Sequence, residues 1–488
     1  MAEFTAAQLR AIAAPGNVLV VAGAGTGKTR TLVERCVARV LDRADPVSLD
    51  DILMVTFTEA AAAEMKRRLR ERLDLEARRR PDRADIAEQF ALVDTARIGT
   101  LHGFCLQLLR EHFHELGLDP QLTVLDDSRA TVLARECLEI GLRRHWTGPE
   151  PADEAVRQLI LVYGNGGDEP IRRLVRRLHD YTQTLPDPET WFDTWETECA
   201  SAQPSRWEPW LLAGFETVRD EWLPVLRSYD HDNLRRCVRA LERAGASPNR
   251  AAVATACAEI AAVDVDANWP HGTKGKFREP NEGFFEEAAF LGSLAELSAD
   301  GADPLVEDWD WVRPHLQALL GLVREFGREF ARAKRDLGAV DFHDLEQFAL
   351  RVLWNSAQNQ PTATAGHWRE RLRCVFVDEY QDINAAQDRI IRALSRAGPA
   401  ANRFLVGDVK QSIYRFRLAD PRIFQGYAGQ WKKPSVAGQA IPLCDNFRSH
   451  PAILEFVNAV FAVVMRREVG GVDYDADARL VAGDTNRQ

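Results

Sequence analysis

A glycine-rich segment near the start of the chain has the residue types that bind phosphate. It reads Ala22-Gly23-Ala24-Gly25-Thr26-Gly27-Lys28-Thr29. Glycine lets backbone N–H groups approach one anion closely, and the N-terminus of a helix directly after the loop adds a favourable potential. Lys28 supplies a charge for the β- and γ-phosphates of a nucleotide, and Thr29 supplies a hydroxyl for Mg²⁺. The segment therefore predicts a phosphate-binding loop with a magnesium site.

The loop departs from the general phosphate-loop pattern at its first position, where Ala22 replaces glycine. The alternative interpretation is a glycine-rich turn without a ligand. The flanking residues favour the phosphate loop. A short apolar run, 18–21, precedes it, and apolar residues recur at helical spacing between 32 and 41. Strand, loop and helix follow one another in the order that phosphate binding needs.

A pair of acidic residues, Asp378 and Glu379, follows the apolar run 374–377. At the end of a buried strand, one carboxylate can hold Mg²⁺ while its neighbour polarises an attacking water. Taken alone, an Asp-Glu pair is usually a strand end that meets solvent. Together with the loop, it predicts that Asp378 holds the metal and that Glu379 is a general base.

The elements that must position these residues alternate between strands and helices. Strand-like runs occur at 52–57 and 96–100. Helical segments follow them at 59–75 and 104–113, and the alternation returns from residue 374. Such alternation predicts an α/β fold with a parallel sheet covered on both faces.

The alternation stops between 106 and 335, where long amphipathic stretches predict a mainly helical inserted domain. Nine of the twelve tryptophans lie in this part, between Trp146 and Trp311. We interpret them as packing residues, because large aromatic side chains dominate buried contacts. A last strand signal at Leu443 and an apolar helix at 453–464 predict the start of a further domain.

Bulk composition excludes several classes of protein. The 488 residues are 45% hydrophobic and 28% charged, which is typical of a globular chain rather than a disordered one. No run of eighteen apolar residues and no secretory signal is present, so we expect a cytoplasmic protein without a membrane partner. The eight cysteines lack metal-ligand spacing. The net charge of −11 argues against a surface that coats nucleic acid, so any DNA path must be a local groove.

Several segments, in order along the chain, resemble the motifs of superfamily 1 helicases of the UvrD/RecB type, and within that family the RecB and AddA branch. The segments are 5–8, 22–29, 56–58, 99–104, 377–382, 406–417 and 446–449. The family's phosphate loop has alanine at its first position, which accounts for Ala22. The segment Asp341-Phe342-His343-Asp344-Leu345 also resembles a recurring family segment, but the sequence assigns it no chemistry.

The resemblance implies roles around the nucleotide. Gln8 would read adenine, and Arg30 would sandwich the base together with Phe447, which stands where the family often has tyrosine. The implied catalytic residues are Lys28, Glu379, Gln411 and Arg448. The Gln411 amide can contact both the γ-phosphate and water, and the planar charge of Arg448 suits the transferring phosphoryl group. Thr29 and Asp378 would hold Mg²⁺, and ATP would be the nucleotide.

The resemblance also implies contacts with single-stranded DNA. The residues concerned are Phe57, Thr100, His102, Tyr414, Phe416 and Arg417. The three aromatic side chains can stack on unpaired bases, although each could equally be a packing residue. Thr100 and His102 can contact phosphates, although a histidine at a strand-to-helix turn is as often a local cap.

Four segments follow from the resemblance. A P-loop, RecA-like motor domain is expected in two parts, 1–105 and 336–440, separated by the helical insertion 106–335. Residues 441–488 would be the incomplete start of a second RecA-like domain. The family's last two helicase motifs do not occur in these 488 residues, so we expect a fragment or one part of a split protein. The expected activity is nucleotide binding with weak or absent unwinding.

The function implied is that of an ATP-dependent translocase or helicase on single-stranded DNA or DNA ends. It would move 3′ to 5′ in DNA repair or recombination, and its possible partner is a second helicase/nuclease subunit. One alternative is a non-catalytic nucleotide- and DNA-binding module of a larger complex. A different P-loop enzyme, such as a small-molecule kinase, would offer no role for the segment 411–417.

Overall fold

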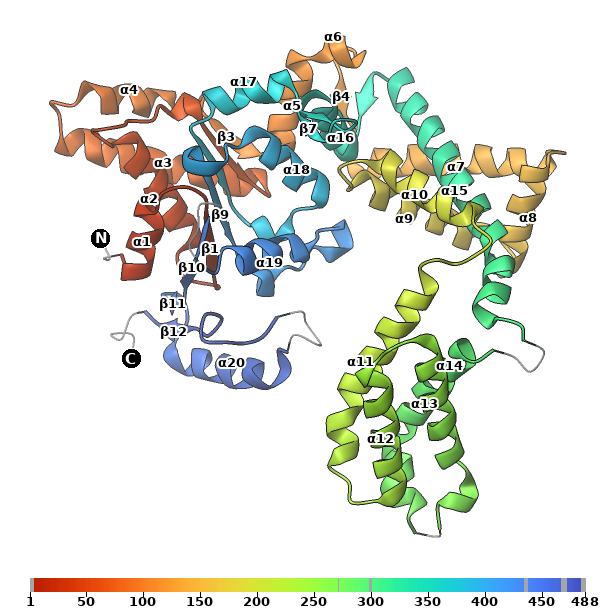
Figure 1. Cartoon of the computed structure of the whole chain (residues 1–488). Helices are drawn as coiled ribbons and strands as arrows, with labels where there is room; N and C mark the ends of the chain where they lie inside the picture. Colours follow the sequence, from red (N-terminus) through yellow and green to blue (C-terminus); the bar gives the residue numbers. More distant parts are fainter. Residues whose placement is uncertain (1–3, 271, 298–300, 434–437, 467–471, 484–488) are drawn as a thin grey trace. The chain divides into compact units, whose positions relative to one another are not determined.

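The computed structural model describes residues 4–270, 272–297, 301–433, 438–466 and 472–483 (Figure 1). They form two compact units. The first unit comprises Met1–Cys137, Arg176–Pro188 and Gly327–Gln488, and the second comprises Leu138–Val175 and Glu189–Phe326. The first unit is therefore assembled from three stretches of sequence that the second unit interrupts.

A six-stranded parallel sheet forms the centre of the first unit (Figure 1). Its spatial order is β10-β1-β9-β8-β2-β3, and every neighbouring pair runs parallel. The strands are β1 (Val18–Ala22), β2 (Ile52–Thr56), β3 (Arg97–Thr100), β8 (Cys374–Val377), β9 (Arg403–Gly407) and β10 (Gln439–Leu443). Parallel neighbours need crossover connections, which helices supply on both faces. The predicted α/β fold with a parallel sheet is confirmed.

Successive residues of a strand point to opposite faces of the sheet, and both faces are buried. On β1, Val20 belongs to one apolar core and Leu19 to the other. The first core is covered by α1 (Ala6–Ala13), α2 (Lys28–Val40) and α3 (Glu59–Arg79). The second is covered by α5 (Leu101–Glu111), α16 (Phe342–Leu353), α17 (Ala363–Arg371), α18 (Ala385–Leu394) and α19 (Pro421–Gln430). The sheet is thus a rigid platform whose loops carry the polar residues.

Shorter elements complete the first unit. Helices α4 (Ala84–Leu92) and α6 (Phe113–Leu116) follow α3 and α5. Strand β4 (Thr123–Val124) pairs in parallel with β5 (Ala339–Val340), and β6 (Trp354–Asn355) pairs antiparallel with β7 (Gln360–Pro361). The β4–β5 pair therefore joins the segment that precedes the second unit in the sequence to the segment that follows it.

Strand β10 corrects one sequence-based boundary. The sequence assigned residues from 441 onward to a second RecA-like domain, yet β10 pairs with β1 along its whole length, from Val18 with Gln439 to Ala22 with Leu443. The strand signal at Leu443 therefore closes the edge of the first sheet. After it come β11 (Asp445–Asn446), α20 (Pro451–Val464) and β12 (Val481–Ala482), and β11 and β12 pair in parallel. Assignment of these later elements to a second motor domain stays a prediction.

The second unit is built from helices. They are α8 (Pro151–Tyr163), α10 (Pro188–Ala200), α11 (Trp207–Arg227), α12 (Asp232–Ala246), α13 (Arg250–Val263) and α14 (Glu282–Ala295). Helices α7 (Asp127–Thr147), α9 (Glu169–Gln183) and α15 (Pro304–Asp336) contribute residues to both units, and the first residue of α10, Pro188, belongs to the first unit. Four of these helices, α11 to α14, share one apolar core. The expected insertion boundaries, 106 and 335, stay a prediction.

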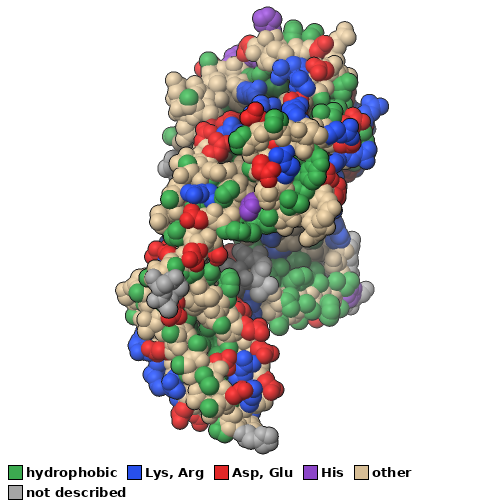
Figure 2. All heavy atoms as spheres, turned by 90° about the vertical axis from the view of Figure 1, so that its right-hand side faces the viewer, with side chains coloured by type: hydrophobic (Ala, Val, Ile, Leu, Met, Phe, Trp, Pro, Cys, Tyr) green, Lys and Arg blue, Asp and Glu red, His purple; other side chains and the backbone are tan. Residues whose placement is uncertain are grey.

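The nine tryptophans of the second unit differ in exposure. Trp269 and Trp309 are buried, as the interpretation of packing residues requires. Trp146, Trp210 and Trp311 are each more than half exposed, although Trp210 still contacts Trp195 and Trp311 contacts Tyr163 and His315. The other four are partly buried. On the face that Figure 2 displays, acidic and basic side chains are interspersed among the described residues without a continuous basic field. None of the helices that the structure describes is long and apolar enough to cross a membrane.

Candidate functional site

The phosphate loop connects the end of β1 to the start of α2. Gly25 and Gly27 have φ angles of 72° and 82°, in the left-handed region that favours glycine. Gly27 is the N-cap of α2, and among the described residues no side chain caps this helix end or adds an acidic group to its first turn. The first N–H groups of α2 are therefore available to an anion, and the helix dipole favours negative charge there.

The segment that follows β10 lies against this loop. Asn446 donates from Nδ2 to the carbonyl oxygen of Ala24 at 2.6 Å, and the N–H of Phe447 donates to the Gly25 carbonyl at 2.9 Å. A Cβ atom at Gly25 would lie only 2.7 Å from both Asn446 Nδ2 and Arg448 Cβ. Glycine is required at 25 by this contact as well as by its backbone angles. The predicted residues Phe447 and Arg448 are thereby brought to the phosphate loop.

Lys28 connects the loop to the acidic pair. Its Nζ lies 2.9 Å from Oε2 of Glu379 and donates to Oε1 of Gln411 at 3.3 Å. Gln411 lies in a short 3-10 helix, η7 (Val409–Gln411), and its Nε2 donates to Asp408 at 2.8 Å. Three of the four predicted catalytic residues thus share direct contacts.

Asp378 is buried beside the start of α2. It is 5% exposed, its Oδ2 accepts from the Thr29 hydroxyl at 3.4 Å, and its Oδ1 accepts from the Glu379 N–H at 3.1 Å. Burial raises the pKa of the Asp378 carboxyl to about 6, and the charge of Glu379 adds to the rise while Lys28 opposes it. A nearby cation would favour the ionised form, so this carboxylate is suited to hold a divalent metal.

The backbone at Glu379 bends sharply. Its φ and ψ are 52° and 41°, a left-handed conformation that is strained for a residue with a side chain. The N–H of Asp378 still donates to the Val55 carbonyl at 2.9 Å, so β8 stays paired with β2 up to that point. The bend directs Glu379 toward Lys28, and such strain is typical of functional sites.

The residues present fit a magnesium-bound triphosphate. The Thr29 hydroxyl and Asp378 carboxylate are oxygen ligands of the kind Mg²⁺ prefers, and they are already hydrogen-bonded to each other. Among the described residues no group of three or more His, Cys, Asp or Glu side chains could hold a metal. Mg²⁺ commonly binds through one or two protein groups plus substrate phosphates. Lys28 and the α2 N-terminus supply the matching positive potential.

Two of the residues predicted to hold adenine, Gln8 and Arg30, contact other parts of the protein. Gln8 is buried, donates from Nε2 to the Thr26 carbonyl at 3.0 Å and forms a capping box with Thr5. The Arg30 guanidinium lies over the ring of Phe4, 4.1 Å from its centroid. Sequence reasoning missed Phe4. Its only signal was an aromatic side chain directly before the segment 5–8.

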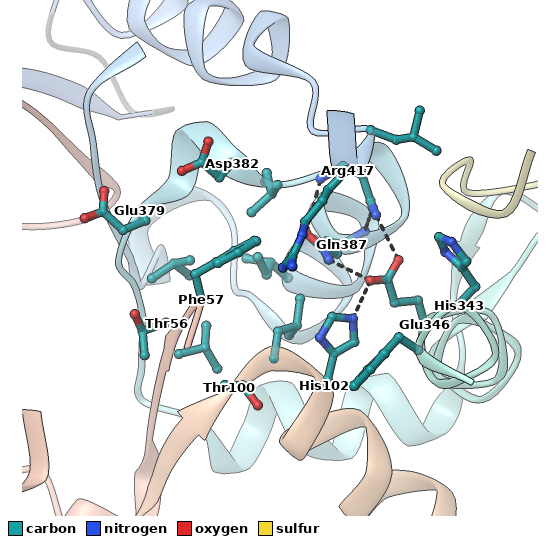
Figure 3. A pocket seen from close by; sticks show the side chains of 18 of the residues that line it. Thr56, Phe57, Thr100, His102, His343, Glu346, Glu379, Asp382, Gln387 and Arg417 are labelled. Atoms are coloured by element: carbon teal, nitrogen blue, oxygen red, sulfur yellow. Dashed lines mark hydrogen bonds and ion pairs between the residues drawn. The ribbon is translucent and has the colours of Figure 1, made fainter. Parts of the chain in front are cut away.

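A cleft of about 450 Å³ lies beside the nucleotide residues, where β2, β3 and β8 end (Figure 3). Five of the predicted DNA-contacting residues line it: Phe57, Thr100, His102, Phe416 and Arg417. The sixth, Tyr414, stacks on Phe57 with ring centroids 4.7 Å apart. Phe416 is 75% exposed. The structure therefore brings all six predicted residues to one cleft or its edge.

Thr100 and His102 are held by carboxylates. Thr100 caps α5 by accepting from the Gly103 N–H at 3.1 Å, and its hydroxyl donates to Glu59 at 2.7 Å. His102 Nε2 lies 2.8 Å from Oε1 of Glu346. The cap of α5 is therefore Thr100 and not His102, for which the local-cap alternative was given. His102 is instead oriented by a residue of α16 that is 244 positions away.

Glu346 lines the cleft beside His102, and sequence reasoning did not single it out. It is 2% exposed, and it accepts from Asn384 Nδ2 at 2.9 Å and Gln387 Nε2 at 2.6 Å as well as from His102. Burial opposes its ionisation, but the hydrogen bond and charge of His102, with a further contribution from Asn384, lower the Glu346 pKa overall. Figure 3 shows this polar cluster away from Glu379 and Asp382 in the cleft.

The segment 341–345, which had no assigned chemistry, now has a structural role. Asp341 caps α16, and Lys334 lies 2.8 Å from Asp341 and 2.6 Å from Asp344. Phe342 lines the cleft and packs against the His102 ring at 5.1 Å between centroids. The segment therefore anchors the helix that carries Glu346.

The cleft itself is rich in carboxylates. Its acidic lining residues are Glu59, Asp127, Asp180, Glu346, Asp378, Glu379 and Asp382. Burial and the charge of Glu379 raise the pKa of the Asp382 carboxyl to about 6. Among the described residues that line the cleft, Arg417 is the one arginine and none is a lysine. Such a cleft repels phosphates and suits a neutral, aromatic ligand with N–H donors.

Comparison with known proteins gives one family. The UvrD/REP helicase N-terminal domain matches residues 4–431. Proteins named as subunits of an ATP-dependent helicase/nuclease are similar over nearly the whole chain. The one from Pelotomaculum thermopropionicum is 34% identical over 98% of this chain, and those from Exiguobacterium sibiricum and Bacillus cereus are 34% and 32% identical over 99%. The chain spans 40% to 42% of the length of these relatives.

Proposed function

The chain belongs to the UvrD/REP helicase family, and we propose that its first unit is an ATP-hydrolysing motor domain that binds single-stranded DNA. The observation that carries the proposal is the contact of Lys28 with Glu379, beside the Thr29–Asp378 pair, at one edge of the parallel sheet. These four side chains are those that phosphate binding, metal binding and water activation need.

Lys28 exchanges partners when a nucleotide binds. Its ammonium group contacts Glu379 and Gln411, so a triphosphate that engages Lys28 takes it away from the carboxylate. Gln411 orients a water beside the γ-phosphate, and Glu379 accepts a proton from it as the water oxygen bonds to the γ-phosphorus. The bond from that phosphorus to the β–γ bridging oxygen breaks, and ADP leaves. Arg448, whose Cβ lies at the loop, supplies charge for the transferring phosphoryl group.

Two further groups complete the nucleotide site. Thr29 and Asp378 would hold Mg²⁺, which would supply positive charge against the β- and γ-phosphates. Arg30, Phe447 and Gln8 hold the adenine. Phe4 supports Arg30, because its ring lies against the guanidinium and keeps that plane in position.

Unpaired bases bind in the cleft rather than on a basic surface. Phe57 and Tyr414 form one stacked pair. Successive bases of a DNA strand lie about 3.4 Å apart, so a base between the two rings needs roughly that spacing on each side and the rings separate to admit it. The carboxylate-rich lining disfavours most of the DNA backbone, and Arg417 and His102 are the lining groups that contact the phosphates nearest to the bound base.

The whole protein acts, on this proposal, as an ATP-dependent translocase or helicase on single-stranded DNA or DNA ends. Its direction is 3′ to 5′, as the family resemblance implies, and its task is DNA repair or recombination. The relatives are named as subunits of a helicase/nuclease, which supports a partner in the form of a second helicase/nuclease subunit.

ATP turnover with and without a poly(dT) oligonucleotide tests the proposal. We expect Lys28→Ala to abolish nucleotide binding and any DNA-stimulated turnover, and Lys66→Ala, on α3 outside the site, to retain both. Turnover that survives in Lys28→Ala would show that the phosphate site is misassigned. Nucleotide and DNA binding with no turnover under any condition would instead favour the non-catalytic module.

A further inference from the structure

One buried amide lies between the nucleotide residues and the cleft. Gln381 belongs to the 3-10 helix η5 (Tyr380–Asp382) and is 1% exposed. Its Nε2 donates to Oε2 of Glu379 at 3.0 Å and to Oδ2 of Asp382 at 2.9 Å. One NH₂ group therefore serves a carboxylate of the nucleotide site and a carboxylate of the cleft.

The other end of the amide is also fixed. Its Oε1 accepts from the Asp408 N–H at 2.9 Å. A Cβ atom at Gly407 would lie 2.5 Å from this oxygen and 2.8 Å from the Phe424 ring. Only glycine at 407 leaves room for the Gln381 amide, so the orientation of its donors is set by β9 and is not free to adjust.

One carboxylate oxygen of Glu379 accepts hydrogen bonds from two donors. Lys28 and Gln381 both approach Oε2, at 2.9 and 3.0 Å. A triphosphate competes for Lys28 by direct charge attraction, whereas the Gln381 amide is engaged with Glu379, Asp382 and Asp408 and not with the phosphate loop. When Lys28 changes partner, Gln381 is the donor that still holds Glu379.

Asp382 is the end of the connection that faces the cleft: it is 6% exposed, and its buried Oδ1 has no hydrogen-bond partner among the described residues. It lines the cleft with Phe57 and Arg417, and Figure 3 shows it on the same side as Glu379. An N–H group of an unpaired base that engages this carboxylate weakens its hold on Gln381. Each carboxylate takes one of the two amide hydrogens, and the oxygen end of the amide stays held by the Asp408 N–H. Weakening the bond to Asp382 therefore alters the remaining hydrogen bond from the same NH₂ group to Glu379.

We propose that Gln381 is a positioning residue that links occupation of the cleft by an unpaired base to the placement of Glu379 in the nucleotide site. It does so by donating to Asp382 and Glu379 at once. The inference rests on the proposed function, since it names how DNA controls the same ATP site. It assigns Gln381 no contact with either ligand.

Thermodynamic coupling between the two ligands tests it, because coupling is reciprocal and needs no turnover. The Kd of a fluorescent, non-hydrolysable ATP analogue with Mg²⁺ is measured with and without saturating poly(dT) oligonucleotide, on the full 488-residue chain. We expect the ratio of the two Kd values to fall from about tenfold in the parent to about one in Gln381→Leu. Tenfold corresponds to ~1.4 kcal/mol, just below the lower end of the range for a hydrogen bond to a charged group.

Two further variants separate coupling from a general loss of structure. Gly407→Ala leaves Gln381 in place but displaces its amide, and it should lower the ratio in the same way. Gln347→Leu is the matched control, because Gln347 donates to the carbonyls of Gln183 and Leu185 in the same unit. Its ratio should equal that of the parent, and thermal unfolding of each variant confirms that it folds.

The outcomes are distinct. A ratio unchanged within twofold in both Gln381→Leu and Gly407→Ala overturns the inference. A ratio of one in the parent, with both ligands binding, also overturns it but leaves the proposed function standing. Failure of the parent to bind either ligand removes the proposed function, and the inference with it.

Discussion

The ammonium group of Lys28 lies 2.9 Å from a carboxylate oxygen of Glu379, although 351 positions of sequence separate the two residues. Lys28 follows β1 and Glu379 follows β8, and both strands are neighbours of β9 in the parallel sheet. The carboxyl ends of parallel strands meet at one edge, where α/β proteins bind their ligands. A nucleotide must therefore compete with a protein carboxylate for the lysine.

Glu379→Gln should separate binding from hydrolysis. Removing the carboxylate charge frees Lys28 for the phosphates, so we expect affinity for a non-hydrolysable ATP analogue to rise. The rise should be severalfold, because the Lys28–Glu379 ion pair is partly exposed and worth roughly 1 kcal/mol or less. Turnover of ATP should fall by about 100-fold or more, because the general base is lost. Titration calorimetry and a phosphate-release assay measure the two effects. Glu34→Gln on α2 is the control, and a drop in affinity in Glu379→Gln would contradict the competition.

Asp378→Asn should stabilise the protein at neutral pH when neither metal nor nucleotide is added. The Asp378 pKa is raised by burial from 3.8 to about 6, so the stability this group contributes is present below about pH 4 and is lost as the pH rises through about 6. The shift corresponds to roughly 3 kcal/mol at most. We expect the variant to melt above the parent at pH 7.5, with the difference closing toward pH 4.

Surface Asp94→Asn, which removes only an exposed pair with Arg70, should show no such trend. A pH-independent difference between Asp378→Asn and the parent would mean that the carboxyl does not titrate in this range. With Mg²⁺ and nucleotide present the order should reverse, because the variant lacks a metal ligand.

Phe57→Ala should weaken binding of single-stranded DNA without changing nucleotide affinity. The side chain stacks on Tyr414 at the edge of the cleft, and loss of a base-stacking ring costs about 1–3 kcal/mol. We expect a decrease of about 5- to 150-fold in affinity for a poly(dT) oligonucleotide, measured by fluorescence anisotropy. Phe90→Ala, on α4, serves as the control. Equal affinities for Phe57→Ala and the parent would assign Phe57 to packing alone.

Glu346→Gln should destabilise the first unit. The carboxylate accepts from His102, Asn384 and Gln387, and an amide would direct its own N–H groups at some of these donors. We expect a loss of about 3 kcal/mol in the free energy of unfolding at pH 7, measured by denaturant titration, and weaker oligonucleotide binding because His102 is no longer held.

The pH dependence of the same variant has the opposite sign to that of Asp378→Asn. The folded-state pKa of Glu346 lies below its ordinary value of 4.5, so its stabilising effect is present above about pH 4.5 and is lost as the pH falls through the folded-state pKa. The difference between parent and Glu346→Gln should therefore be constant from pH 6 to 8 and narrow in acid. Exposed Glu71→Gln provides the comparison.

Local patterns account for the parts of this protein that could be predicted. The alternation of apolar strands with amphipathic helices was enough to predict the parallel sheet and its interruption. Strands buried on both faces appear as short apolar runs, and the helices that cover them appear as apolar residues at helical spacing. The phosphate loop and the acidic pair were recognisable because the chemistry demands particular residue types at fixed spacing. Both signals are carried by neighbours in the sequence.

Contacts between distant segments could not be predicted from such local patterns. The place of β10 at the edge beside β1, the stacking of Arg30 on Phe4 and the three donors around Glu346 depend on which strands pair and in which register. The sequence by itself determined which residues could bind phosphate, metal and DNA bases. Only the tertiary structure decided that the Gln381 amide lies between Glu379 and Asp382, since a buried amide acquires its partners from the chain that folds around it.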